Sequence, residues 1–234
     1  MSGRPLRSGL PALPPSMQHL PIDARGFPVP YFVALVSGSP DHRVMDGSKL
    51  MPAVKRGLCW ICGKRMTSGL FTFTIGPMCC ITRTISEPPS HHECATYAAT
   101  SCPFLTRPYA KRRGVDLPEN AIEPAGVGLK RNPGATCLWT TTSFEVDRLP
   151  EGSPEGRAGV LFGLGDPIAL DWYAEGRRAT RAEVDASIES GLPLLAPSVE
   201  AQGQGADIEL WRRRQLLTLT LDRLTWPQGT GVTS

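Results

Sequence analysis

Hydrophobic and polar residues alternate over residues 71–75 (Phe-Thr-Phe-Thr-Ile), which lie in the first half of the chain. A period of two residues is typical of a strand with one buried face. A Gly-Pro pair at residues 76–77 follows and interrupts the pattern. We therefore predict a short, half-buried strand at this place.

Upstream of this strand, Tyr31–Val36 is rich in β-formers, and a second short strand is predicted around His42–Met45. The turn residues 37–40 (Ser-Gly-Ser-Pro) separate them, which favours a hairpin. Ser48 is a suitable N-cap for a helix, and Gly57 is a suitable end. The sequence thus predicts a hairpin followed by a helix.

A further helix is predicted after the rigid loop 86–90 (Ser-Glu-Pro-Pro-Ser). Ser90 followed three residues later by Glu93 matches a capping box, which favours a helix start. His91 and Cys94 then lie three residues apart on one face of the first turn.

The second half of the chain resumes strand patterns. The stretches rich in β-branched or aromatic residues are Thr136–Val146, Gly159–Leu164 and Ile168–Tyr173. Thr180 and Glu183 form another capping box, and the helix they begin is expected to end at Gly191. A last amphipathic helix is predicted over Asp207–Leu224. Its expected apolar face holds Ile208, Trp211, Leu217, Leu221 and Leu224.

These elements predict an α+β protein: a module with a β-hairpin and helices, joined to a small antiparallel sheet covered by helices. The predicted layout is a disordered Pro-rich arm (1–26), an α+β module (27–106) that the cysteine spacing described below marks as zinc-binding, a basic Pro/Gly-rich connector (107–134), a small sheet with two helices (135–226) and a tail (227–234).

Composition limits the function classes. The chain has 234 residues, of which 41% are hydrophobic, and its 24 Gly and 23 Pro favour short elements and many loops. A net charge of +3 is too small to indicate a nucleic-acid binder by itself. No apolar run is long enough for a signal peptide or a membrane span, so we expect a cytoplasmic protein.

The clearest chemistry lies in the cysteines. Six of the seven, with two of the four histidines, fall between Cys59 and Cys102. Cys59 and Cys62 form a Cys-x-x-Cys-Gly knuckle, and His91 with Cys94 follows about thirty residues later, a spacing typical of tetrahedral zinc sites. In a reducing compartment, clustered thiols indicate metal ligands rather than disulfides.

A knuckle, a hairpin and a helix that supplies two ligands resemble the treble-clef zinc finger, over about forty residues. The resemblance implies Cys59, Cys62, His91 and Cys94 as the ligands of a structural Zn²⁺ ion. The chain departs from the family at the helix, where the pair is most often Cys-x-x-Cys.

Other residues compete for the site. His92 can replace His91 if the helix begins one residue later. Cys79 or Cys80 can replace a histidine, giving a four-cysteine site or an iron–sulfur cluster. Cys102 and Cys137 are interpreted as small buried hydrophobic residues.

Several motifs together resemble a group of uncharacterised bacterial and phage proteins. They are Cys-Trp-Ile-Cys-Gly (59–63), Ile-Gly-Pro-Met-Cys (75–79), Ser-Glu-Pro-Pro-Ser-His (86–91), Cys-Ala (94–95) and Cys-Pro-Phe-Leu (102–105). The resemblance carries no activity, but it supports Cys79 as a candidate ligand and implies a phage or mobile-element origin.

A basic stretch follows the predicted zinc helix. Its cationic residues are Arg107, Lys111, Arg112 and Arg113, and Tyr109 lies between them as a stacking ring. Such a stretch favours contact with nucleic acid through phosphates, or with a protein partner. The alternative interpretation is a solvated linker.

Enzymatic interpretations find less support. A metal-dependent nuclease of the His-Asn-His type would use the histidine that does not bind metal, yet residues 98–101 offer no second histidine or asparagine. A cytidine deaminase needs a Cys-x-x-Cys after its His-x-Glu, and here the only one lies before it. The sequence therefore favours a zinc-stabilised binding protein over an enzyme.

Overall fold

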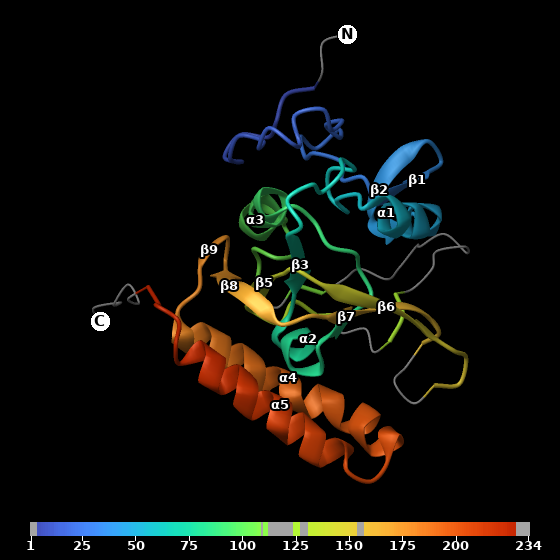
Figure 1. The fold of residues 1–234 in the computed structure, drawn as a ribbon. Helices are drawn as coiled ribbons and strands as arrows, with labels where there is room; N and C mark the ends of the chain where they lie inside the picture. Colours follow the sequence, from blue (N-terminus) through green and yellow to red (C-terminus); the bar gives the residue numbers. More distant parts are fainter. Residues whose placement is uncertain (1–3, 109, 112–123, 127–130, 154–156, 228–234) are drawn as a thin grey trace.

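The computed structural model describes residues 4–108, 110–111, 124–126, 131–153 and 157–227 (Figure 1). The strands are β1 (Val33–Val36), β2 (Ser39–Met45), β3 (Phe71–Ile75), β4 (Thr84–Ile85), β5 (Thr136–Thr141), β6 (Phe144–Leu149), β7 (Gly159–Leu164), β8 (Pro167–Ala174) and β9 (Arg177–Arg178). The helices are α1 (Leu50–Arg56), α2 (Pro77–Thr82), α3 (His92–Ser101), α4 (Arg181–Gln202) and α5 (Ala206–Leu221), with a 3₁₀ turn at Gly47–Lys49.

The central sheet has the order β3-β5-β8-β9, and every pair in it is antiparallel. Phe73 lies opposite Trp139, and Cys137 lies opposite Trp172. All six residues of β5 are buried, because helices cover both faces of the sheet. The strand predicted over residues 71–75 is confirmed, and its partner comes from the second half of the chain.

The predicted strand Thr136–Val146 is divided in two. β5 ends at Thr141 and β6 begins at Phe144, after a turn in which the Thr141 hydroxyl donates to the Ser143 carbonyl. β6 lies outside the central sheet. It pairs with β7, which also pairs with β4. A second sheet of order β4-β7-β6 results.

Helices lie on both faces of the central sheet (Figure 1). α3 covers one face, and α2 lies on the other, where α4 and α5 pack against it side by side. One hydrophobic core contains Phe73 and Ile81 together with Trp139, Trp172 and Leu221. Residues from both sides of the predicted connector therefore share this core.

α4 does not end at Gly191 as the sequence predicted. It continues to Gln202 through Pro193 and Pro197. Gly191 is a contact point, since an added Cβ would lie 2.8 Å from Met78 Cε on α2. The glycine thus permits close approach of two helices, and packing of the following turn, including buried Leu195, outweighs its low helix propensity.

The predicted apolar face of the last helix is also divided. Leu217 and Leu221 are buried in the core, whereas Ile208 and Trp211 remain 55% and 60% exposed. At 100° per residue, these two pairs lie on opposite sides of α5. Only one of its two apolar sides therefore meets the core.

The N-terminal segment differs from the expected disordered arm. Residues 4–26 lie against the molecule, and the Met17 side chain is only 1% exposed. The Val29 amide donates to the Pro21 carbonyl, and the Tyr31 amide donates to the Ile61 carbonyl, so the segment leads directly into the first hairpin. In the part of the chain that the structure describes, no helix has both the length and the apolarity needed to cross a membrane.

We predict that Gly165→Ala destabilises the protein by about 1–3 kcal/mol, because its Cβ would overlap the backbone of the β5–β6 turn. The new atom would lie 2.4 Å from the Ser143 carbonyl oxygen. Gly163→Ala is the matched control, since its Cβ meets Glu145 Cβ at an ordinary 3.5 Å. Urea unfolding of both variants tests this, and equal stabilities would contradict it.

Candidate metal centre

A tight turn after α1 presents the first two cysteines. α1 ends at Gly57, and the chain then folds back so that the Gly63 amide donates to the Cys59 carbonyl over 2.8 Å. The Cys59 amide donates to the Lys64 carbonyl, also over 2.8 Å. Gly63 has φ +74°, and an added Cβ would lie 2.9 Å from Tyr31 Cδ2, so glycine is required at this position.

The second pair of ligands is placed by β3. Thr72 and Ser90 exchange both backbone hydrogen bonds, and the Trp60 amide donates to the Pro89 carbonyl. The loop before α3 is therefore held beside both the strand and the knuckle. Residue 91 becomes the N-cap of α3, and Cys94 lies in the first turn.

The predicted capping box at the start of this helix is not formed. α3 begins at His92, and the side chain of its N-cap residue, His91, accepts no capping hydrogen bond. Ser90 lies one residue too early to cap the helix, because its backbone is paired with Thr72. His91 and Cys94 nevertheless face the same place.

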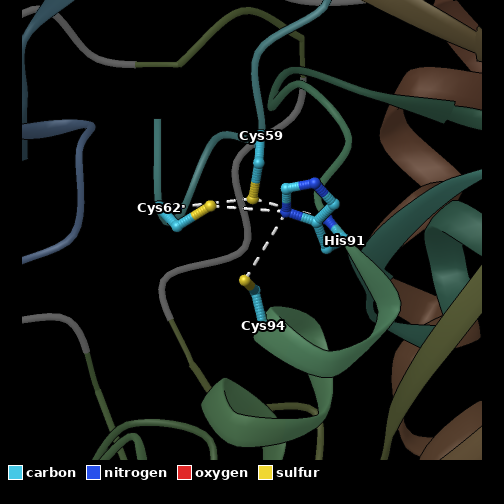
Figure 2. A group of neighbouring side chains, drawn as sticks. All are labelled: Cys59, Cys62, His91 and Cys94. Atoms are coloured by element: carbon cyan, nitrogen blue, oxygen red, sulfur yellow. Dashed lines mark hydrogen bonds between the residues drawn. The ribbon is translucent and has the colours of Figure 1, made fainter. Parts of the chain in front are cut away.

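Four ligand atoms converge between the knuckle and α3 (Figure 2). The Sγ atoms of Cys59, Cys62 and Cys94 and a ring nitrogen of His91 all lie within 4.8 Å of one another. His91 Nδ1 is 3.3 Å from Cys62 Sγ and 3.8 Å from Cys94 Sγ. With metal–nitrogen bonds of about 2.0–2.1 Å and metal–sulfur bonds of about 2.3 Å, a tetrahedral site has nitrogen–sulfur edges of about 3.5 Å, and the two His91 separations lie on either side of this value.

Neighbouring backbone groups orient the ligands. Cys59 Sγ accepts hydrogen bonds from the amides of Cys62 and His91, both at 3.4 Å. His91 Nε2 lies 3.2 Å from the Arg65 carbonyl oxygen, which can only accept, so Nε2 carries the proton. In this tautomer the lone pair of the ring lies on Nδ1, the atom that faces the three sulfur atoms.

The three thiols perturb one another strongly. All three cysteines are buried. Hydrogen bonds from Cys62 and Cys94 hold the pKa of Cys59 far below its usual range. Donating these hydrogen bonds to Cys59 stabilises the protonated thiols of Cys62 and Cys94. The pKa of Cys62 is therefore raised to about 11, and that of Cys94 is raised further. Without a metal, the group thus favours one thiolate and two protonated thiols.

The competing ligands lie elsewhere. Cys79 and Cys80 belong to α2 and face the main core, and burial raises the pKa of both thiols. His92 Nε2 lies 2.9 Å from Asp171 Oδ2 on β8, so its ring joins α3 to the central sheet. The four residues that the structure brings together are thus those predicted as first choice, and the three substitutes are not among them.

The two remaining cysteines, Cys137 and Cys102, do not belong to the group of candidate ligands. Cys137 is fully buried in the core, as predicted. Cys102 is half-buried and is the C-cap of α3, where its amide donates to the Ala98 carbonyl.

The basic stretch is described only in part. Arg107 and Lys111 have exposed side chains, whereas Arg112, Arg113 and Tyr109 lie outside the described residues. Asn132, which is buried, donates to the carbonyls of Phe104, Leu105 and Arg107 through its Nδ2 atom. This amide, which the sequence reading missed, fixes the backbone that carries Arg107.

Several residues that contact the four candidate ligands were also not predicted from the sequence. Ser16 Oγ lies 3.1 Å from Cys94 Sγ, and His19 Nε2 lies 2.9 Å from the Cys62 carbonyl oxygen. Met17 packs in the same hydrophobic cluster as the three cysteines. No periodic pattern or motif in residues 4–26 indicates these contacts.

Comparison with family models, with curated proteins and with solved structures finds no match for this chain. The resemblance to bacterial and phage proteins therefore stays a prediction. The treble-clef hairpin is not formed as expected, because β3 pairs with β5 and β4 with β7, with α2 between them. The structure defines a mixed α/β protein with antiparallel sheets and a candidate metal site of three cysteines and one histidine.

We predict that His91→Ala abolishes metal binding and lowers stability by several kcal/mol, because the ion that organises the module is lost. His92→Ala should retain the metal and cost less than about 1 kcal/mol, since it removes only a half-exposed contact with Asp171. Elemental analysis with circular dichroism measures both. Metal retained in His91→Ala would refute this ligand assignment.

Metal binding near neutral pH should release about two protons rather than three, because Cys62 and Cys94 must lose theirs whereas Cys59 is already ionised. Raised pKa values favour the protonated, metal-free form as pH falls. Apparent affinity should therefore rise about a hundredfold per pH unit between pH 6 and 8. Calorimetry in buffers of different ionisation enthalpy counts the protons, and a release of three would show that Cys59 is protonated.

Proposed function

We propose that the four residues hold one structural Zn²⁺ ion that stabilises the N-terminal part of the protein. The observation that carries this proposal is the convergence of three buried sulfur atoms and His91 Nδ1 within 4.8 Å. A Cys₃His donor set is typical of structural zinc, and soft thiolates disfavour Mg²⁺ and Ca²⁺. The order of ligands, knuckle first and helix second, supports a treble-clef-like module with a modified hairpin.

A structural role is favoured over a catalytic one, because four protein ligands leave no position for water. The nuclease alternative would need the second histidine beside the metal. His92 instead contacts Asp171 Oδ2, which Arg178 also engages. His19 does lie beside the group, but its Nε2 donates to the Cys62 carbonyl oxygen, and it does not stand on the helix that carries Cys94, as the nuclease pattern requires. This alternative therefore gains no support.

We further propose that the zinc-stabilised module binds a partner through the basic stretch. Arg107 and Lys111 are exposed, and their backbone is held in place by Asn132 and by an isolated pairing of Lys111 with Arg131. A fixed backbone with exposed cationic side chains suits phosphate contact, so nucleic acid is the partner that the chemistry favours. A protein with an acidic surface is the alternative.

Fluorescence anisotropy with labelled single-stranded and duplex oligonucleotides tests this proposal across a salt series. Arg107→Ala/Lys111→Ala should weaken binding and lower the salt slope by about 2, because each phosphate contact releases counterions. Lys55→Ala/Arg56→Ala, which removes two exposed cations from the end of α1, is the matched control. Equal loss in both variants, or no binding by the wild type, would refute nucleic-acid binding through this stretch.

A further inference from the structure

The segment of residues 13–20 lies against the metal group without belonging to a helix or a strand. Within the part of the chain that the structure describes, its backbone hydrogen bonds are local: the Met17 amide donates to the Pro14 carbonyl, and the Leu20 amide donates to the Met17 carbonyl. Its place in the molecule therefore depends on what its side chains contact.

Four of these side chains contact the candidate ligands or lie in their hydrophobic cluster. Ser16 Oγ lies 3.1 Å from Cys94 Sγ, and His19 Nε2 donates to the Cys62 carbonyl oxygen. Met17 and Leu20 are buried in the hydrophobic cluster that contains Cys59, Cys62 and Cys94. The segment thus covers the four candidate ligands with apolar side chains and forms hydrogen bonds with two of them, Cys62 and Cys94.

Bound metal strengthens these contacts for a chemical reason. A metal-bound thiolate can only accept hydrogen bonds, so Ser16 must donate to Cys94, and such charge-assisted bonds are stronger than neutral ones. Coupling between two binding events is reciprocal. If bound metal stabilises the docked position of this segment by a given free energy, the docked segment therefore stabilises bound metal by the same free energy.

We propose that residues 13–20 form a strap that closes the metal centre, sets the rate at which zinc leaves and is released when zinc is lost. This inference rests on the proposed function in so far as the centre holds a metal. The strap excludes water and competing thiols from the sulfur atoms.

The test is the rate of zinc transfer from the full-length protein to an excess of a colorimetric chelator. Ser16→Ala/His19→Ala should keep one zinc per chain and release it about thirtyfold faster, because the two hydrogen bonds that hold the strap are removed. Ser8→Ala, at an exposed serine outside residues 13–20, is the matched control and should release zinc at the wild-type rate. Ser16→Ala alone serves if the double variant misfolds by circular dichroism.

A second readout is digestion with chymotrypsin, which can cut after Met17, whereas Leu13 and Leu20 are each followed by proline and resist cleavage. The zinc-loaded protein should resist cleavage after Met17, and the chelated protein should be cut in this segment first. If the wild type holds one zinc and the variants release it at the wild-type rate, the strap is refuted and the zinc site stands. If the wild type holds no zinc, the proposed function fails and the strap fails with it.

Discussion

Three sulfur atoms and one imidazole nitrogen must share a buried space only a few ångströms across, and the N-terminal part of the molecule is arranged around this constraint. Cys59, Cys62 and Cys94 offer up to three negative charges in an interior that tolerates them only beside a cation. The knuckle, the loop before α3 and residues 13–20 all meet at this point. The knuckle and residues 13–20 belong to no sheet and no long helix, so contacts at this cluster hold them, whereas the loop before α3 is also paired with β3.

α3 connects this group to the rest of the protein. Cys94 on one side of the helix faces the metal group, while Ala95 and Ala99 on the other side pack on Leu138 of β5. His92 adds a polar contact to Asp171 on β8 at the same end. A small, alanine-rich face lets the helix lie close to the sheet, so the position of the ligands and the position of the central strands are linked through one short element.

The ligands could be predicted because their spacing is local. Cys-x-x-Cys-Gly forms a tight turn wherever it occurs, and His91 and Cys94 lie on one side of a helix start in either cap assignment. The choice among the other candidates could not be made in this way. Cys79 and Cys80 are close in sequence to the site, and only the helix α2, which turns them into the main core, removes them from it.

The sequence by itself determined most of the strands and helices, the mixed α/β class and the four residues that converge as candidate ligands, because each follows from periodicity or spacing over a few residues; it did not predict α2, which follows the Gly-Pro break. The tertiary structure alone decided the rest. The pairing of β3 with β5, the passage of α4 through Gly191 and the burial of Met17 each depend on a contact between segments far apart in the chain. Such contacts are set by the complementary shapes of side chains from different elements, which no local pattern records.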